Sequence, residues 1–194
     1  NFIKKEFIRF GIKPIKDNYF QTFSYAINTF PGKIKVALGD KDLIPGIDFL
    51  VDPKSAKTNG KYEVVWYDET SVPNKKRLNK LAKQHFFDKK FIVVDNSGKN
   101  KKEEFELLKS NTVGAVGLIF IEENKLTHHL STQVSDYLIL RILRDKLDKS
   151  LRTISVEIDQ KFIPEYQSQN VIGKVEGIEF PDSIIVFSAH YDHL

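Results

Sequence analysis

Two short apolar runs on either side of a helical stretch constrain the fold of this chain more than any other sequence feature. Phe91–Val94 and Val113–Ile121 have the length and composition of buried strands, and Glu103–Lys109 between them places its apolar residues on one helical face. A helix between two such runs indicates a βαβ unit with parallel strands. Gly114 and Gly117 would let the neighbouring backbones approach closely. The sequence therefore predicts parallel pairing within this stretch.

Short strands dominate the rest of the pattern. Phe2–Phe10 has the apolar spacing of a helix that stops at Gly11, and Asn74 precedes a second amphipathic stretch. The strand density is high from residue 33 to residue 159, which predicts a compact β-rich module within an α+β or α/β chain. Further strands are expected at Tyr19–Ile27, Ile34–Leu38, Tyr62–Tyr67, Tyr137–Ile142, Leu151–Ile158, Val171–Val175 and Ile184–Ser188.

Composition excludes several classes of protein. The 194 residues carry a net charge of +4 and are 41% hydrophobic, which is enough to build a core. Cysteine is absent, so disulfides and Cys-ligated metals are excluded. No apolar run reaches the ~20 residues of a membrane-spanning helix. The basic clusters at Lys75–Arg77 and Lys99–Lys102 are interleaved with acidic residues, which favours solvated loops over nucleic-acid binding.

The chain begins at Asn1 without a methionine and stops at Leu194, directly after an apolar run. We interpret it as an internal fragment of a longer protein. That interpretation matters for the last run, which ends in a candidate metal motif. On a strand His190 and Asp192 would share one face, so the carboxylate could orient an imidazole that binds a metal ion. By itself a His-x-Asp pair is more often structural.

The sequence around this pair resembles one peptidase family. Gln169–Gly177 (QNVIGKVEG) and Asp182–Leu194 (DSIIVFSAHYDHL) are similar to two central-sheet strands of the di-zinc aminopeptidases, which include secreted bacterial leucyl-type aminopeptidases and transferrin-receptor-like peptidases. Phe7–Pro14 and Tyr19–Phe23 look like the first helix and strand of that family. The resemblance implies a zinc-peptidase α/β/α domain that is truncated in this chain.

The middle of the chain resembles a second module, the protease-associated domain that such aminopeptidases carry as an insertion. The similar segments are Lys90–Gly98, Val113–Ile121 and Leu126–Ser131, with Phe30–Asp52 as a lead-in. The implied division gives residues 1–30 and 161–194 to the peptidase domain and residues 31–160 to the insertion. Asp159–Gln169 is expected to be an exposed linker between them.

Site roles follow from the resemblance residue by residue. His190 matches the family's first zinc ligand, and Asp192 matches the carboxylate that orients it. The family's other ligands and its glutamate base have no counterpart before Leu194. His193, His85 and the pair His128-His129 have no matching role. Two adjacent histidines on a strand would face opposite sides and could not hold one ion together.

The function implied by the resemblance is that of an exported aminopeptidase that removes N-terminal residues from peptides. Two Zn²⁺ ions would activate a bridging water in the whole protein. This chain alone is expected to be inactive and to hold zinc weakly, because a zinc site needs at least three protein ligands. The alternatives are a protease-associated module that only binds other molecules, or a catalytically dead relative. Peptide substrates are the expected partners, and nucleic acid is not.

Overall fold

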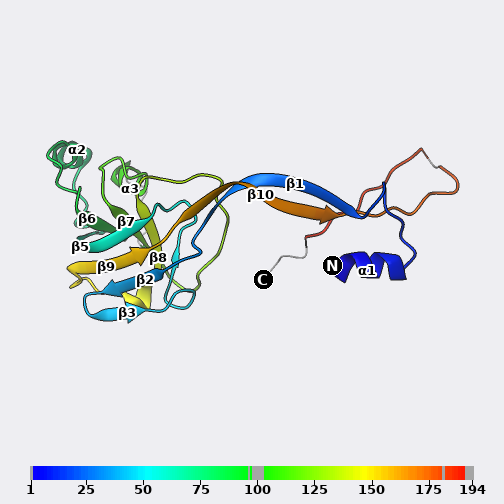
Figure 1. The fold of residues 1–194 in the computed structure, drawn as a ribbon. Helices are drawn as coiled ribbons and strands as arrows, with labels where there is room; N and C mark the ends of the chain where they lie inside the picture. The colour runs from blue at the N-terminus through cyan, green and yellow to red at the C-terminus, as the bar shows by residue number, and fades with distance from the viewer. Residues whose placement is uncertain (1, 96, 98–102, 181, 191–194) are drawn as a thin grey trace. The chain divides into compact units, whose positions relative to one another are not determined.

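The chain divides into two units. The structure is a computed structural model that describes residues 2–95, 97, 103–180 and 182–190. One unit comprises residues 25–166, and the other comprises residues 1–24 together with 167–194. Figure 1 shows the elements of both units, whose bounds are α1 Phe2–Arg9, β1 Phe20–Thr29, β2 Ile34–Leu38, β3 Lys41–Leu43, β4 Phe49–Val51, β5 Thr58–Tyr67, α2 Lys75–Lys83, β6 Lys90–Val94, α3 Glu103–Lys109, β7 Gly117–Glu122, β8 Leu138–Leu143, a 3₁₀ turn at Arg144–Lys146, β9 Thr153–Ile158 and β10 Lys161–Val171.

The unit of residues 25–166 is built on one eight-stranded sheet. Its strand order is β3-β2-β9-β5-β6-β7-β8-β4. Strands β5 to β8 run parallel to one another, whereas β9, β2, β3 and β4 pair antiparallel with their neighbours. The outermost strands, β3 and β4, are consecutive in sequence and are joined by residues 44–48. The sheet therefore curls until its two edges nearly meet, and the β-rich module expected from the sequence is confirmed.

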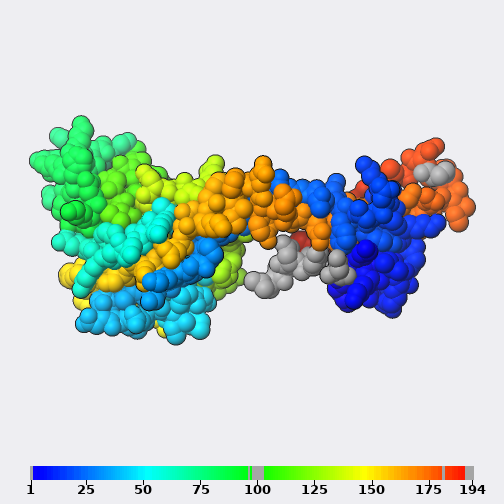
Figure 2. Space-filling view, viewed as in Figure 1, coloured from blue at the N-terminus to red at the C-terminus, as the bar shows by residue number. Residues whose placement is uncertain are grey.

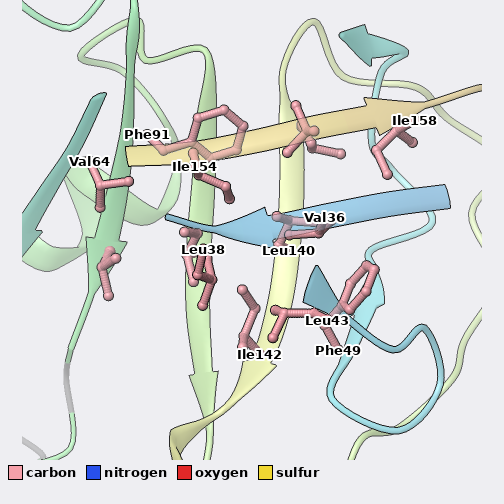
Figure 3. Packing of buried hydrophobic residues seen from close by; sticks show 14 residues of the cluster. Val36, Leu38, Leu43, Phe49, Val64, Phe91, Leu140, Ile142, Ile154 and Ile158 are labelled. Atoms are coloured by element: carbon pink, nitrogen blue, oxygen red, sulfur yellow. The ribbon is translucent and has the colours of Figure 1, made fainter. Parts of the chain in front are cut away.

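The predicted βαβ unit is present as β6-α3-β7, with Phe91 opposite Gly117 in the parallel register. Strand β6 is apolar from Phe91 to Val94 because both of its faces are buried there. Phe91 and Val93 point into the core enclosed by the curled sheet. Ile92 and Val94 pack under helices α2 and α3. Figure 3 shows the enclosed core, where side chains of β2, β8 and β9 converge with Phe91.

Helix α2 begins where the sequence predicts it. The Asn74 side chain accepts a hydrogen bond of 3.0 Å from the backbone N–H of Arg77, which caps the first turn. Leu78 is the fully buried residue of the helix and packs against the sheet. The cap and this single anchor together hold a nine-residue helix that would be marginal by itself.

Replacing the cap tests its contribution. We expect Asn74→Ala to lower the free energy of unfolding by about 1 kcal/mol, because a backbone N–H of the first turn loses its acceptor. Asn79→Ala is the matched control, because Asn79 lies inside the same helix and is exposed. Urea denaturation followed by circular dichroism measures both variants. Equal stability of Asn74→Ala and the unmodified protein would contradict the assigned role.

The structure differs from the sequence-based expectations at three segments, one expected to be a linker and two expected to be strands. Asp159–Gln169 is exposed but is not an irregular linker, because strand β10 covers most of it and pairs with β1. The rings of Tyr25 and Tyr166 meet edge to face, with centroids 5.6 Å apart. Pro164 is compatible with this strand, because a two-stranded ribbon has outer edges that need no N–H donor.

The other two differences concern the C-terminal runs. Val171–Val175 is a strand only up to Val171, after which Lys174 forms an isolated bridge with Lys13. Ile184–Ser188 has no regular secondary structure. A strand needs a partner for its backbone N–H and C=O groups, and the described part of the chain pairs no strand with this run.

The unit of residues 1–24 and 167–194 has a small apolar contact of its own. The Phe7 ring meets the Tyr19 ring edge to face at 6.1 Å, and the Tyr19 hydroxyl donates to the carbonyl of Ile12 at 2.7 Å. Gly173 lies close against Phe7 and Ile12, so a side chain there would displace them. Helix α1 ends at Arg9, and Gly11 follows it in the left-handed conformation with φ of 71°.

Candidate functional site

The predicted metal motif lies in an exposed segment. His190 is exposed and has no regular secondary structure around it. Asp192, the expected orienting carboxylate, and His193 lie outside the described residues. The apolar run before the motif is exposed as well, with Ile184 at 84% and Phe187 at 93%. An exposed apolar run of this kind is typical of a surface that packs against another part of a protein.

The remaining histidines do not form a metal site. The imidazole Nδ1 of His85 is 3.0 Å from a carboxylate oxygen of Asp88 at the surface. His128 and His129 lie in the loop between β7 and β8 and not on a strand, so the argument from opposite strand faces does not apply. Within residues 2–95, 97, 103–180 and 182–190 there is no group of three His, Cys, Asp or Glu residues that could hold a metal ion.

These residues do not by themselves fit zinc. His190 can supply one imidazole ligand, whereas a catalytic zinc ion needs three protein ligands. The described part of the chain offers His190 no such set of partners. We therefore assign no reaction step to a metal ion held by the described residues alone.

A second candidate site lies where the parallel strands of the sheet end. Strands β5 to β8 point the same way, so the residues at their carboxyl ends gather at one edge. Ligands of α/β sheets commonly bind at this edge. Asp95 directly follows β6, Glu123 follows β7 and Arg144 follows β8. Charged side chains therefore replace the apolar ones at the point where each strand leaves the core.

An open pocket of about 480 Å³ lies at this edge. Val94, Phe120 and Ile121 contribute its apolar lining, and Arg141 and Arg144 are among its charged residues. The pocket has room because residues 123–137, all of them described, connect β7 to β8 without a helix. The earlier crossovers of this sheet carry α2 and α3.

Both arginines of the pocket are held by pairs of carboxylates. Arg144 Nη2 is 3.0 Å from Asp95, and its Nε is 2.7 Å from Glu123. Arg141 donates to Glu122 at 2.8 Å through Nη1 and to Asp52 at 3.0 Å through Nε. Since each guanidinium makes several charge-assisted hydrogen bonds, its orientation is fixed before any ligand arrives.

The ion pair between Asp95 and Arg144 lowers the pKa of the carboxyl group and raises that of the guanidinium group. Burial alone would raise the pKa of the Asp95 carboxyl, but the hydrogen bonds from Arg144 and Ser97 and the charge of Arg144 outweigh it, so the pKa lies below its ordinary value. The hydrogen bond that Arg144 donates to Asp95 raises the pKa of Arg144 in turn. Asp95 is thus ionised and bound to Arg144 over the whole neutral range.

These residues were not found from the sequence. A weak signal was available, because Asp52 and Asp95 each stand directly after a short apolar run, and Arg141 interrupts the apolar run of β8. Single charged residues at strand ends are common in loops. Only the parallel pairing of the strands shows that Asp95 and Arg144, which are 49 positions apart, meet.

Removal of the Asp95 charge gives a pH-dependent test. The folded-state pKa of Asp95 lies below the ordinary value of 3.8, so its contribution is present above about pH 4 and is lost as the pH falls through the folded pKa. We expect Asp95→Asn to be about 1.5–3 kcal/mol less stable at pH 7, the usual contribution of a hydrogen bond to a charged group. The difference should shrink as the pH falls below about 4 and through the folded-state pKa of Asp95.

Thermal unfolding of both proteins across this pH range measures the effect. Asp88→Asn is the control, because Asp88 is exposed and its ion pair with His85 lies at the surface. A stability difference for Asp95→Asn that is the same at pH 7 and at acid pH would show that the Asp95 charge does not matter.

Comparison with known proteins places this fold. No family model matches the chain, and no curated protein matches it either. Solved structures do match. An aminopeptidase from Aneurinibacillus sp. strain AM-1 is 14% identical with a TM-score of 0.57, over 92% of this chain and 42% of that one. The zinc aminopeptidase BSAP from Bacillus subtilis is 13% identical with a TM-score of 0.58, over 93% of this chain and 41% of its own.

A peptidase M28 precursor from Shewanella amazonensis SB2B is 16% identical with a TM-score of 0.54, over 90% of this chain and 44% of that one. The chain thus spans about two fifths of the length of the structures it matches. At this level of identity the likeness shows the fold alone. The resemblance read from the sequence is confirmed at that level, because the chain has the fold of a stretch of bacterial zinc aminopeptidases and of an M28 peptidase.

Proposed function

We propose that this chain is the N-terminal part of an exported, zinc-dependent aminopeptidase that removes N-terminal residues from peptides. In this proposal residues 31–160 form a protease-associated insertion. Residues 1–30 and 161–194 belong to a peptidase domain whose remaining strands and ligands lie outside this chain. His190 is a zinc ligand, and Asp192 orients its imidazole.

The agreement of fold with motif carries the proposal. The structural likeness to bacterial aminopeptidases and to an M28 peptidase extends over at least nine tenths of the chain. The sequence resemblance to the di-zinc aminopeptidases rests on the short segments Gln169–Gly177 and Asp182–Leu194. The fold and the motif therefore point to the same class of protein.

The exposure of the last apolar run supports the same conclusion. Ile184, Ile185 and Val186 are each at least 79% exposed, which is unusual for consecutive apolar residues of a folded protein. A central strand of a larger sheet would be apolar on both faces and would pair on both edges. The run fits a strand whose neighbours belong to the rest of the peptidase domain.

The chemistry of the proposed site follows from its ligands. Zinc accepts imidazole and carboxylate ligands, and the bound ion acidifies water and polarises a carbonyl group. What this chain contributes is His190 as one ligand. The imidazole binds metal through one ring nitrogen only when that nitrogen is deprotonated, and a carboxylate on the other nitrogen favours that tautomer.

The test uses the whole protein and this chain side by side. We expect the whole protein to hydrolyse aminoacyl anilides and to lose this activity with a chelator, with recovery on added Zn²⁺. The isolated chain should show no turnover and should not bind zinc with a defined stoichiometry in calorimetry. Turnover that resists chelation would remove the zinc assignment. Stoichiometric zinc binding by the isolated chain would show a site that His190 does not explain.

A second candidate function is a binding module without catalysis. The open pocket beside Arg141 and Arg144 favours it, because the two guanidinium groups are pre-oriented next to an apolar lining. The two functions are compatible in one protein. Assays on the whole protein distinguish the two functions. A catalytically dead relative would bind peptides but would hydrolyse none, whichever metal ion is added.

A further inference from the structure

Three lysines form a stripe along the exposed face of α2. Lys76, Lys80 and Lys83 are spaced by four and three residues, so they lie on one side of the helix. At about 100° per residue this side lies opposite Leu78, which is fully buried in the core. All three lysines are exposed. The helix therefore packs with one face and presents a purely cationic stripe, the lysine stripe, on the other.

No acidic side chain among the described residues forms an ion pair with this stripe. Five of the nine residues of α2 are Lys or Arg, and none is acidic. The nearby carboxylate of Glu103 pairs with Lys75 instead. Among the described residues the three lysines of the stripe have no ion-pair partner. Like charges at these spacings weaken a helix, whereas Lys80 and Lys83 also lie in its last turn, where cations interact favourably with the helix dipole.

An exposed aromatic ring stands beside the lysine stripe. Phe86, in the turn after α2, is 41% exposed and meets the fully buried Phe87 edge to face, with centroids 5.0 Å apart. The ammonium of Lys90 lies 4.9 Å from the centre of the Phe86 ring, and Lys89 is exposed next to it. Figure 2 shows this region, in green, at the outer surface of its unit. Phe86 is thus an exposed ring in the turn that follows the lysine stripe, next to Lys90, which also pairs with Glu63, and two residues before Asp88.

We propose that the lysine stripe and Phe86 dock this unit on an anionic phospholipid bilayer. The positive charge of the stripe is complementary to the negative charge of such a bilayer, and each lysine near the surface adds to the attraction. Lysine is a mobile point charge that suits a diffuse layer of headgroups, whereas recognition of nucleic-acid phosphates and bases favours the planar fork of arginine. The helix has a single arginine, Arg77. An aromatic ring beside the cations suits the boundary between headgroups and acyl chains.

The mode of docking is peripheral. Leu78 and the apolar face of α2 are already used by the core, so the helix cannot insert that face into lipid. The described residues include no helix that is long and apolar enough to cross a membrane. Binding should therefore be mostly electrostatic and should weaken steeply as salt is added.

The test is sedimentation of the full 194-residue chain with lipid vesicles. One set contains phosphatidylcholine alone and the other adds about 30 mol% phosphatidylglycerol, each at about 50 mM and about 500 mM salt. We expect binding to the anionic vesicles at low salt only. The variant Lys76→Gln/Lys80→Gln/Lys83→Gln should bind about a hundredfold more weakly, since each lysine contributes separately.

A control variant removes the same charge elsewhere. Lys54→Gln/Lys61→Gln/Lys125→Gln replaces three exposed lysines that lie outside α2, so its net charge equals that of the stripe variant. It should lose less than about threefold in binding. Circular dichroism melting confirms that both variants are folded.

Three results would overturn the proposal. The first is equal binding to neutral and anionic vesicles, and the second is an equal loss in the control variant, which would mean that only net charge matters. The third is tighter, equally salt-dependent binding to a short DNA duplex or to polyglutamate than to vesicles. That result would assign the lysine stripe to another class of partner.

Discussion

Gly117→Ala is expected to destabilise the protein by about 3 kcal/mol and to lower its melting temperature by about 10 °C. Gly117 is the first residue of β7 and stands directly opposite Phe91 in the parallel register. The ring of Phe91 is fully buried and lies over this glycine, so an added methyl group would overlap it, with Cζ only 2.6 Å away. The Tyr62 ring packs against the Phe91 ring, with centroids 5.4 Å apart, so a displaced Phe91 would disturb a second aromatic side chain.

A second substitution distinguishes this overlap from a general intolerance of β7. Phe91→Leu by itself should cost stability by leaving a cavity, but combined with Gly117→Ala it should cost less than the sum of the two single changes. Gly177→Ala serves as control, since a methyl group there meets only ordinary contacts, the nearest at 3.6 Å. Unfolding in urea gives all four values. Strict additivity of the two changes would show that the residues do not touch.

Gly117 also shows what the sequence could predict. Apolar runs with a helix between them identified β6, α3 and β7, because burial on both faces leaves a continuous apolar signature. The start of β7 was placed four residues early, at Val113. Val113 and Ala115 are buried although they precede the strand, and Asn111 and Gly114 have positive φ values of 52° and 76° that shape a turn. An apolar run therefore indicates which residues are buried, and in this segment the buried residues begin before strand β7 does.

The errors at β10 and at Ile184–Ser188 have a different cause. The charged residues and the proline of Asp159–Gln169 indicated a linker, whereas the structure has strand β10 there, paired with β1. A ribbon of two strands keeps much of its surface in solvent, so its sequence can be as polar as that of a linker. The apolar run Ile184–Ser188 has strand composition, but pairing requires a second strand. The local sequence pattern indicates which secondary structure a segment prefers. Which strand it pairs with depends on the whole fold.

The pocket at the strand ends could not be predicted for the same reason. Arg141 and Asp52 are far apart in the chain, and each by itself is an ordinary charged residue after or within a short strand. Their meeting depends on β4 pairing with β8, which is a contact between the outermost strand of the sheet and its neighbour. The motif proposed at His190 could be suggested from the sequence because its residues lie within three positions of one another, and its metal role stays a prediction.

His190→Ala is expected to abolish aminopeptidase activity in the whole protein. The imidazole is a proposed zinc ligand, and a catalytic site that loses one of three protein ligands cannot hold the ion in place. Metal content measured on the purified variant should fall together with turnover of an aminoacyl anilide. His128→Ala is the matched control, because His128 is an exposed histidine in the loop between β7 and β8. It should keep full activity and full metal content.

Asp192→Asn gives the graded counterpart of that loss. An asparagine keeps the shape of the side chain but removes the negative charge that favours the metal-binding tautomer of His190. We expect metal affinity or activity to fall by roughly 10–100-fold, the usual effect of a group that orients a metal ligand. Excess Zn²⁺ should restore part of the activity of Asp192→Asn and none of that of His190→Ala, since only the latter lacks a ligand. Full activity in His190→Ala, with unchanged zinc content, would exclude this histidine from the metal site.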